Sequence, residues 1–428
     1  MSQVKNILVF PAGTEIALEI NNALRYSKFV RLFGGTSTAC HAQFVFERCI
    51  EGIPFVDAND FIDVINAITD KYEIDYIYPA HDSVITRLAE ERDKLHAQLV
   101  ACNTETVRIC RSKNRTYAHL SGAAYLPGYY DSPDAVPEYP VFIKPSVGQG
   151  SQGARRIDSR AALEEALSDG VEYAICEYLP GEEFTVDCFT DRHGELRYIG
   201  PRNRQRIRAG ISVRSAHFEP DEAIREIAKD INSRFEFRGA WFFQIKKNLH
   251  GEYRLMEAAP RIAGTMSVSR NMGVNLPLLT LFDLWGYDVD IINNGNELLL
   301  DRAFISRFET DISYSRVYVD FDDTIVVNGK VNGMLMMFLY QANGAGKDII
   351  LLTKHAHDIM ESLEHYAVSP KLFSRIIHIG QNDEKSEHIQ PDSIFIDDSF
   401  AERVKVSRRC AVPVFDLDMV ESLLDWRA

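Results

Sequence analysis

The sequence has 428 residues, of which 46% are hydrophobic, and a formal net charge of -15. A chain longer than about 300 residues is expected to fold as two or more domains. The acidic balance argues against a nucleic-acid partner, because binding to phosphates requires a surplus of lysine and arginine. The arginine cluster at 202–208 is the one place where that objection weakens.

The N-terminal part of the chain predicts a parallel α/β lobe. We expect strands at 7–10, 29–33 and 76–79 and helices at 15–26 and 84–99. This rhythm is typical of βα units on a parallel sheet. The first strand-to-helix turn contains Gly13 but no G-x-G-x-x-G pattern, which favours a Rossmann-like lobe over residues 1–103 without a dinucleotide site.

The cysteine pattern and the lengths of the apolar runs bear on the compartment of the protein and on membrane contact. The seven cysteines are scattered without a Cys-x-x-Cys pair, which suits a reducing compartment, and we expect the cytoplasm. The chain enters a strand directly after its N-terminus, and no apolar run approaches the roughly 20 residues of a membrane span. We therefore expect no membrane partner.

A lysine and a run of small residues follow the apolar stretch at 141–143. Lys144, at the strand end, would place a fixed positive charge beside the α- and β-phosphates of a nucleotide. The glycine run also fits an ordinary hairpin when it is taken alone, and Lys144 strengthens the phosphate-binding interpretation. Backbone N–H groups could close over phosphate oxygens where no Cβ obstructs them, at Gly148, Gly150, Ser151 and Gly153.

Two further blocks complete a nucleotide site. The predicted strand at 175–179 could offer backbone hydrogen bonds to adenine, and Glu183 could hold the ribose hydroxyls; a hairpin with solvated glutamates is the alternative. Gln244 lies on the apolar strand at 241–245 and Glu257 on the next strand. Two hard oxygen ligands on paired strands suit Mg²⁺, which takes the rest of its shell from water and phosphate.

Residues 1 to about 308 resemble the ATP-grasp superfamily, in the branch of the carbamoyl-phosphate synthase large subunit and carboxylate–amine ligases. The resemblance implies an ATP-grasp domain at 104–310, with a lid at about 115–185. It also implies ATP and Mg²⁺, or Mn²⁺, as cofactors, and phosphorylation of a carboxylate to an acyl phosphate that an amine attacks. The implied contacts are Lys113 and Lys144 to phosphates, Glu177, Tyr178 and Leu179 to adenine, Glu183 to ribose, Gln244 and Glu257 to magnesium, and Arg261 to the transferred phosphate.

One departure from the family pattern concerns the second metal. The family commonly has asparagine two residues after the metal-binding glutamate, where this chain has Ala259. A second ion would then be held more weakly or by another ligand. Purine-pathway ATP-grasp enzymes share the Glu-x-Ala-Pro-Arg motif, so Ala259 does not indicate a loss of activity.

Substrate contacts are expected from loops of the N-terminal lobe and of the ATP-grasp domain. The alternatives that remain open are a loop histidine without a role and a solvated loop of arginines. Arginines could pair with a substrate carboxylate or phosphate. The candidates are His81, Asp82, Arg206, Arg208 and Ser212.

A second set of acidic motifs begins after residue 312. The apolar strand at 317–319 ends in Asp320 and Asp322, which a turn could direct toward one phosphate site. Asp320 would be the nucleophile that forms an aspartyl phosphate, and Asp322 would protonate the leaving oxygen and then activate water. Thr353 could bind phosphate, Lys385 could neutralise the phosphoaspartate, and both Asp320 and Asp322 would join Asp397 and Asp398 as Mg²⁺ ligands.

These motifs resemble the haloacid dehalogenase (HAD) superfamily and imply a phosphatase domain at 313–428. Singly each motif is weak, since an Asp-Asp pair is often only a helix cap. The segments 325–352 and 354–384 are too short for a sizeable cap domain, so we expect an open site that could accept a bulky substrate.

The sequence therefore predicts a bifunctional α/β and α+β multidomain enzyme. An ATP- and Mg²⁺-dependent ligase would join a small carboxylate to an amine, possibly phosphorylated, and a phosphatase would remove a phosphate from substrate or product. A small-molecule kinase with a phosphatase domain, or a nucleotide sensor, are the alternatives. The oligomeric state stays open, with a homodimer as one possibility.

Overall fold

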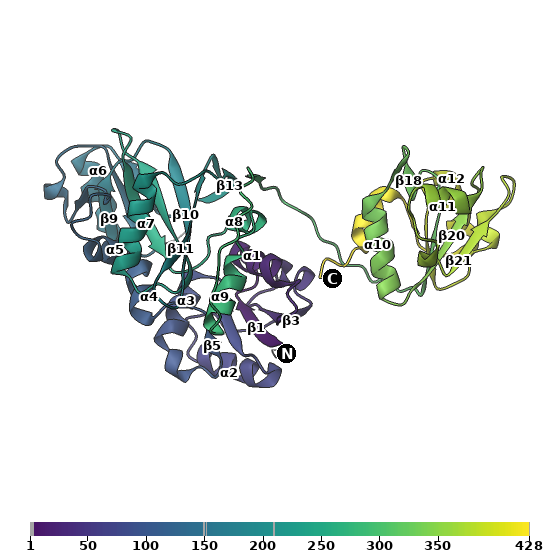
Figure 1. Cartoon of the computed structure of the whole chain (residues 1–428), viewed down its shortest axis with the longest axis horizontal. Helices are drawn as coiled ribbons and strands as arrows, with labels where there is room; N and C mark the ends of the chain where they lie inside the picture. Colours follow the sequence, from purple (N-terminus) through teal and green to yellow (C-terminus); the bar gives the residue numbers. More distant parts are fainter. Residues whose placement is uncertain (1–3, 149, 151, 209, 428) are drawn as a thin grey trace. The chain divides into compact units, whose positions relative to one another are not determined.

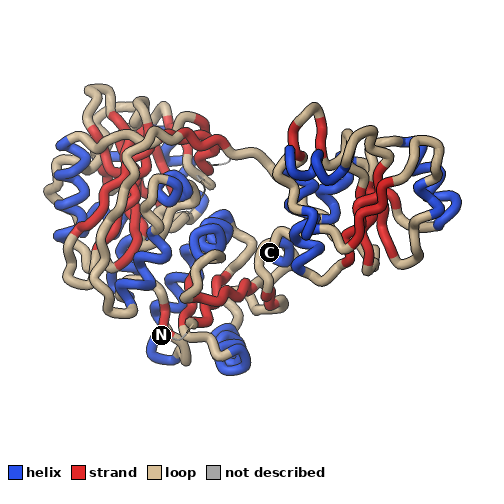
Figure 2. The backbone as a smooth tube through the Cα atoms, turned by 45° about the vertical axis from the view of Figure 1, so that its right-hand side comes forward, coloured by secondary structure: helices blue, strands red, loops and turns tan. Residues whose placement is uncertain are grey.

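The computed structural model describes residues 4–148, 150, 152–208 and 210–427, in two compact units, Met1–Phe304 and Ile305–Ala428 (Figure 1). The predicted boundary near residues 310–313 lies shortly after this division. Both units mix helices and strands (Figure 2). Among the helices of the described residues, none is both long enough and apolar enough to cross a membrane.

The first unit opens with a five-stranded parallel sheet in the order β3-β2-β1-β4-β5. This confirms the predicted parallel sheet, with β1 at its centre. Thr14 caps α1 by accepting a hydrogen bond from the N–H of Ala17. The strands are β1 (Lys5–Phe10), β2 (Val30–Gly35), β3 (Arg48–Ile50), β4 (Tyr76–Pro79) and β5 (Gln98–Leu99), and the helices are α1 (Glu15–Leu24), α2 (Phe61–Tyr72) and α3 (Asp82–Glu90).

The prediction of one helix over 84–99 is wrong beyond Glu90. After α3 the chain makes a short 3-10 turn at Arg92–Lys94 and then enters β5. Leu99 pairs with Ile77 of β4 and is buried at the sheet edge. Burial beside a strand thus outweighs the helical pattern of the sequence at this place.

Two antiparallel four-stranded sheets follow, in the orders β6-β9-β7-β8 and β11-β10-β14-β15. Helices α4 (Thr104–Arg111) and α5 (Lys113–His119) connect them to the parallel sheet. The first sheet contains β6 (Tyr129–Tyr130), β7 (Val141–Pro145), β8 (Arg155–Ile157) and β9 (Tyr173–Glu177), with α6 (Arg160–Ala166); the second contains β10 (Glu183–Thr190), β11 (Leu196–Asn203), β14 (Gly239–Lys247) and β15 (Tyr253–Ala259), with α7 (Glu222–Arg234).

A three-stranded sheet and two helices complete the first unit. The sheet has the order β12-β13-β16. Helix α9 follows β14 and β15 in sequence yet lies against α1 and β14, so it joins the parallel sheet to the antiparallel one (Figure 1). These elements are β12 (Arg206–Arg208), β13 (Ile211–Ala216), β16 (Leu299–Asp301), α8 (Ser267–Asn271) and α9 (Leu276–Leu284).

The second unit is built on a parallel sheet in the order β21-β20-β17-β22-β23. The first strand in sequence, β17, again lies at the centre. Strands β20 and β21 lie on one side of it and the later strands β22 and β23 on the other, so the order of the strands reverses beside β17. In open α/β sheets this switch point, at the carboxyl ends of the strands, is the usual place of a ligand. The strands of this sheet are β17 (Arg316–Val319), β20 (Asp348–Thr353), β21 (Arg375–His378), β22 (Ser393–Ile396) and β23 (Val414–Phe415), and the helices are α10 (Gly333–Gly344), α11 (Ile359–His365) and α12 (Phe400–Cys410). Strands β18 (Val326–Val327) and β19 (Lys330–Val331) form a separate antiparallel pair.

Candidate functional sites

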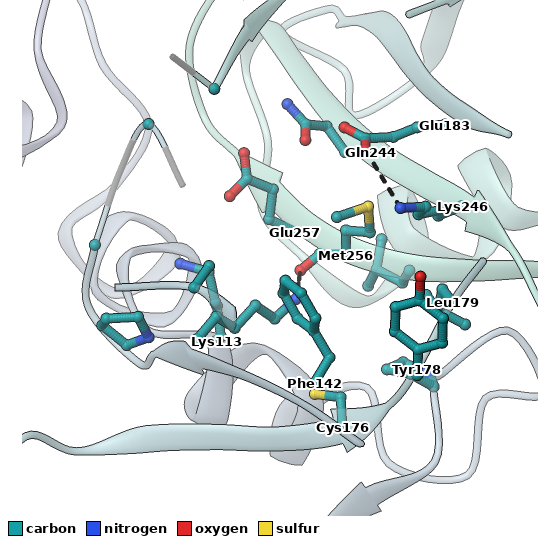
Figure 3. A pocket seen from close by; sticks show the side chains of 18 of the residues that line it. Lys113, Phe142, Cys176, Tyr178, Leu179, Glu183, Gln244, Lys246, Met256 and Glu257 are labelled. Atoms are coloured by element: carbon teal, nitrogen blue, oxygen red, sulfur yellow. Dashed lines mark hydrogen bonds and ion pairs between the residues drawn. The ribbon is translucent and has the colours of Figure 1, made fainter. Parts of the chain in front are cut away.

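A cavity in the first unit lies between the two antiparallel sheets (Figure 3). Strands β7 and β9 supply one wall, and strands β10, β14 and β15 supply the other. Of the predicted nucleotide contacts, most line it together: Lys113, Lys144, Gly148, Gly150, Glu177, Tyr178, Leu179, Glu183, Gln244 and Glu257. Gly153 has a positive φ of 71° and does not line the cavity, and Ser151 lies outside the described residues.

Two lysines give the cavity its positive end. The Lys144 ammonium, almost completely buried, donates to the carbonyl of Met256 at 2.8 Å and lies 5.3 Å from the ring centre of Tyr117. Burial lowers the pKa of Lys144, and the nearby charge of Lys113 adds to the effect. A buried ammonium whose pKa is lowered by burial is stabilised by an anionic ligand such as a phosphate, which favours its charged form.

The opposite end combines an apolar wall with a charged group. Leu179 is buried, and the Arg156 guanidinium stacks on the Tyr178 ring at 4.9 Å. Glu183 forms an ion pair with Arg204 at 2.7 Å and lies 3.9 Å from Lys246 (Figure 3). This end can hold a planar base between apolar side chains and offer a carboxylate to hydroxyl groups.

Arg204 and Lys246 line the cavity and were missed by the sequence reasoning. Lys246 could have been predicted, because it lies two residues after Gln244 on the same strand, and residues i and i+2 of a strand share one face. Arg204 belongs to the arginine cluster that was singled out, but nothing in the pattern distinguishes it from its neighbours.

Gln244 and Glu257 are direct partners in the antiparallel pairing of β14 with β15. Their side chains point into the cavity that Lys113 also lines (Figure 3). Both offer hard oxygen atoms, and the cavity leaves room for phosphate oxygens to complete a shell, so the residues fit Mg²⁺. Ala259 lies on the same strand with a methyl group that offers no ligand.

Arg261 and Asp82 meet in a second hollow, which adjoins the first and is also lined by Arg111, Lys113 and Glu257. The Arg261 guanidinium binds both carboxylate oxygens of Asp82, with an Nη2–Oδ2 distance of 2.8 Å. Burial raises the pKa of Asp82, but the opposing charge of Arg261 and its hydrogen bonds outweigh this and lower that pKa to about 2. The pair links α3 of the parallel lobe to the segment that directly follows β15, the strand that carries Glu257.

The other predicted substrate contacts lie elsewhere. Arg206 pairs with Asp301 at 2.6 Å, Arg208 stacks on Phe304 at 5.4 Å, and neither lines the two hollows. The Ser212 hydroxyl is buried against that of Ser215 at 2.8 Å. His81 caps α3, where its Nδ1 accepts from the N–H of Ser83 at 3.3 Å, and burial lowers its pKa.

We expect Asp82→Asn to destabilise the first unit by about 2 kcal/mol at pH 7, because the carboxylate loses its attraction to Arg261. The pKa of Asp82 falls from 3.8 to about 2 on folding, so its contribution is present above pH 3.8 and is lost as the pH falls through about 2. Urea unfolding at pH 7 and pH 3 measures this.

At pH 3 the free energy of unfolding of Asp82→Asn should differ from that of the unmodified chain by only about 1 kcal/mol. Asp57→Asn, at an exposed aspartate, serves as the control and should change stability by less than about 0.5 kcal/mol at both pH values. A constant difference for Asp82→Asn across this range would contradict the account.

The acidic motifs of the second unit meet at the carboxyl ends of β17, β20 and β22. Asp320, Asp397 and Asp398 place oxygen atoms within 4.8 Å of one another. Lys385 lies between two of them, with Nζ at 2.8 Å from Asp320 and 2.6 Å from Asp397. Thr353 is fully buried at the end of β20, beside β17.

Burial dominates the electrostatics of this cluster. It raises the pKa of Asp397 to about 6, with Lys385 opposing and Asp320 reinforcing the rise. It also raises the pKa of Asp320 against the opposing effect of Lys385. Burial lowers the pKa of Lys385, but the two carboxylates outweigh this and raise it. One ammonium among three carboxyl groups leaves excess negative charge on hard oxygens, which fits a divalent cation such as Mg²⁺.

Asp322 lies apart from that cluster. Its carboxylate is 53% exposed, and both of its oxygens lie 2.9 Å from Nδ1 of His355. Asp322 is absent from the group of three that brings carboxylate oxygens together. Asp322 is thus close to the predicted nucleophile in sequence, but its side chain contacts His355 instead of the acidic cluster. The sequence reasoning missed this histidine.

Comparison with known proteins gives partial matches to this chain. A family model described as ATP-grasp in the biosynthetic pathway with Ter operon matches residues 171–298. The chain is 28% identical over 216 residues to the carbamoyl phosphate synthase arginine-specific large chain of Bacillus subtilis (strain 168), covering 45% of this chain and 21% of that protein. This chain therefore spans about a fifth of the length of that relative.

Solved structures agree at the level of the fold. The biotin carboxylase domain of Hydrogenobacter thermophilus 2-oxoglutarate carboxylase, in complex with MgADP, ADP and bicarbonate, matches with a TM-score of 0.57 and 16% identity over 68% of this chain and 72% of that one. L-amino acid ligase from Bacillus licheniformis matches with a TM-score of 0.52 and 18% identity over 66% and 75%. The first unit has the ATP-grasp fold.

Proposed function

We propose that the first unit is an ATP- and Mg²⁺-dependent ligase that joins a small carboxylate to an amine. The observation that carries this proposal is the convergence of Lys144, Glu183, Gln244 and Glu257 on one cavity, beside a second hollow with Arg261. Residues 1–103 would serve as a substrate lobe and 104–310 as the ATP-grasp domain, with a lid at about 115–185.

The comparisons support this choice of reaction. One structural neighbour is an L-amino acid ligase by its name, and the carboxylase neighbour was solved with MgADP and ADP. ATP and Mg²⁺ are accordingly the cofactors that we assign to this site.

The chemistry requires two steps. A carboxylate oxygen of the acid attacks the γ-phosphorus, and the bond to the β–γ bridging oxygen breaks, which gives an acyl phosphate and ADP. The amine then attacks the carbonyl carbon, and the bond to the phosphate oxygen breaks, which releases inorganic phosphate and a proton. Bound Mg²⁺ would neutralise charge on the phosphate oxygens.

The residues of the first unit have distinct parts in these steps. Lys144 and Lys113 would hold the phosphates. Arg261 would bind the transferred phosphoryl group once substrate replaces Asp82 as its partner, and Arg111 would attract the acid, because a guanidinium matches carboxylate geometry. Glu183 would hold the ribose, and Gln244 with Glu257 would hold the metal.

We propose that the second unit is a phosphatase of the HAD type. What supports this is the cluster of Asp320, Asp397 and Asp398 bridged by Lys385 at the switch point of the parallel sheet. An Asp320 oxygen would attack the phosphorus, the ester bond would break, and Asp322 would give its proton to the leaving oxygen. Water, deprotonated by Asp322, would then release inorganic phosphate from Asp320.

The fusion of the two units has a chemical motive. If the amine carries a phosphate, its removal from the coupled product would make the overall reaction irreversible. The test is incubation with ATP, Mg²⁺ and a panel of acids and phosphorylated amines, followed by mass spectrometry. A condensation product supports the ligase, while an acid or amine that has only gained a phosphate identifies a kinase and overturns it.

A further inference from the structure

We infer that His355 is a positioning residue for Asp322, and that the second site is built for phosphate esters of aliphatic alcohols. This inference rests on the proposed phosphatase function and names its substrate class. It assigns a role to a histidine that follows Thr353 by two residues, at the same edge of the sheet.

The contact between the two side chains is specific. His355 Nδ1 lies 2.9 Å from each carboxylate oxygen of Asp322, so one N–H donates to both. The imidazole is 9% exposed and Asp322 is 53% exposed. A half-exposed carboxylate would otherwise sample several rotamers, and the buried ring restricts it to one.

The imidazole is itself held by its surroundings. The Asp322 carboxylate accepts, so Nδ1 carries the N–H that faces it. Nε2 lies 2.7 Å from the Ser362 hydroxyl of α11, which can donate to it in this tautomer. The ring packs edge-on against Phe321 with centroids 5.0 Å apart, and the His355 carbonyl accepts from His378 at 2.7 Å. Ser362 and Phe321 thus hold the ring in place, with Nδ1 facing Asp322.

The value of this arrangement depends on the leaving group. When Asp320 attacks phosphorus, the electrons of the breaking P–O bond go to the leaving oxygen. An alkoxide is a poor leaving group and must receive the Asp322 proton as the bond breaks. A nitrophenolate leaves without a proton, so the orientation of Asp322 matters little for it.

The experiment measures kcat/KM for β-glycerophosphate and for p-nitrophenyl phosphate, with the full chain and Mg²⁺. We expect His355→Ala to lower the value for β-glycerophosphate about 100-fold and that for p-nitrophenyl phosphate less than about 3-fold. His355→Asn places an amide N–H near the position of Nδ1 and should restore β-glycerophosphate hydrolysis to within about 5-fold of the original.

His365→Ala, at an exposed histidine of α11, is the matched control and should leave both values unchanged. Equal losses on the two esters, with or without a lower Tm, would overturn the inference, as would full activity of His355→Ala on β-glycerophosphate. Failure of the proposed function is distinguishable, because both esters would then be hydrolysed as well by Asp320→Asn as by the original chain.

Discussion

Lys144→Met should abolish ATP-dependent product formation, lowering kcat at least about 100-fold, while leaving the first unit folded. The ammonium is buried in the cavity wall, where it would stabilise charge on the phosphates as the γ-phosphoryl group is transferred. Methionine has a similar length and no charge. The measurement is the rate of ADP release with an active acid–amine pair at saturating ATP.

The stability of Lys144→Met separates a chemical role from a structural one. Burial lowers the pKa of Lys144, so removal of the charge relieves a desolvation cost, while the lost bond to Met256 removes about 1 kcal/mol. The two effects oppose each other, and we expect a Tm within about 3 °C of the original. Lys229→Met, at an exposed lysine of α7, is the control and should retain activity.

Asp320→Asn should lower phosphate-ester hydrolysis at least about 10⁴-fold, because the amide cannot form the aspartyl phosphate. Asparagine is nearly isosteric, and Lys385 keeps its bond to Asp397 at 2.6 Å, so the fold should persist. ADP formation by the first unit should be unchanged, and a coupled product that still carries its phosphate should accumulate. Phosphate release from the ester and mass spectrometry of the product measure both effects.

Asp323→Asn gives a matched control for this variant. Asp323 is exposed and has a φ of 49°, a left-handed conformation that asparagine tolerates well. It should hydrolyse phosphate esters at the original rate. Loss of ADP formation in Asp320→Asn would contradict the independence of the two centres.

Local sequence patterns were sufficient to predict which strands carry the main residues of both sites. Apolar strands with charged ends predicted where Lys144 and Asp320 stand, and the alternation of strands and helices predicted the parallel sheet of the first unit. Gln244 and Glu257 were placed on neighbouring strands, and they are direct partners. Such features depend on residues close in sequence, where periodicity and turn chemistry decide the structure.

Contacts between distant segments could not be predicted in this way. Arg261 binds Asp82 across 179 positions, and no local pattern contains that distance. Arg204 reaches the cavity while Arg206 and Arg208 point to β16 and Phe304, because the chain turns between β11 and β12. The pairing of β17 with β20 brings Asp322 and His355 together from positions 33 residues apart.

The central claim is phosphoryl transfer from ATP to a carboxylate at the cavity of the first unit. Its most direct measurement uses acids with an ¹⁸O-labelled carboxylate, ATP, Mg²⁺ and the amine panel in the Asp320→Asn background, with ³¹P NMR of the phosphate released. An acyl phosphate intermediate predicts one ¹⁸O in inorganic phosphate and equal amounts of ADP and coupled product. Unlabelled phosphate, or cleavage of ATP to AMP and pyrophosphate, would contradict the account.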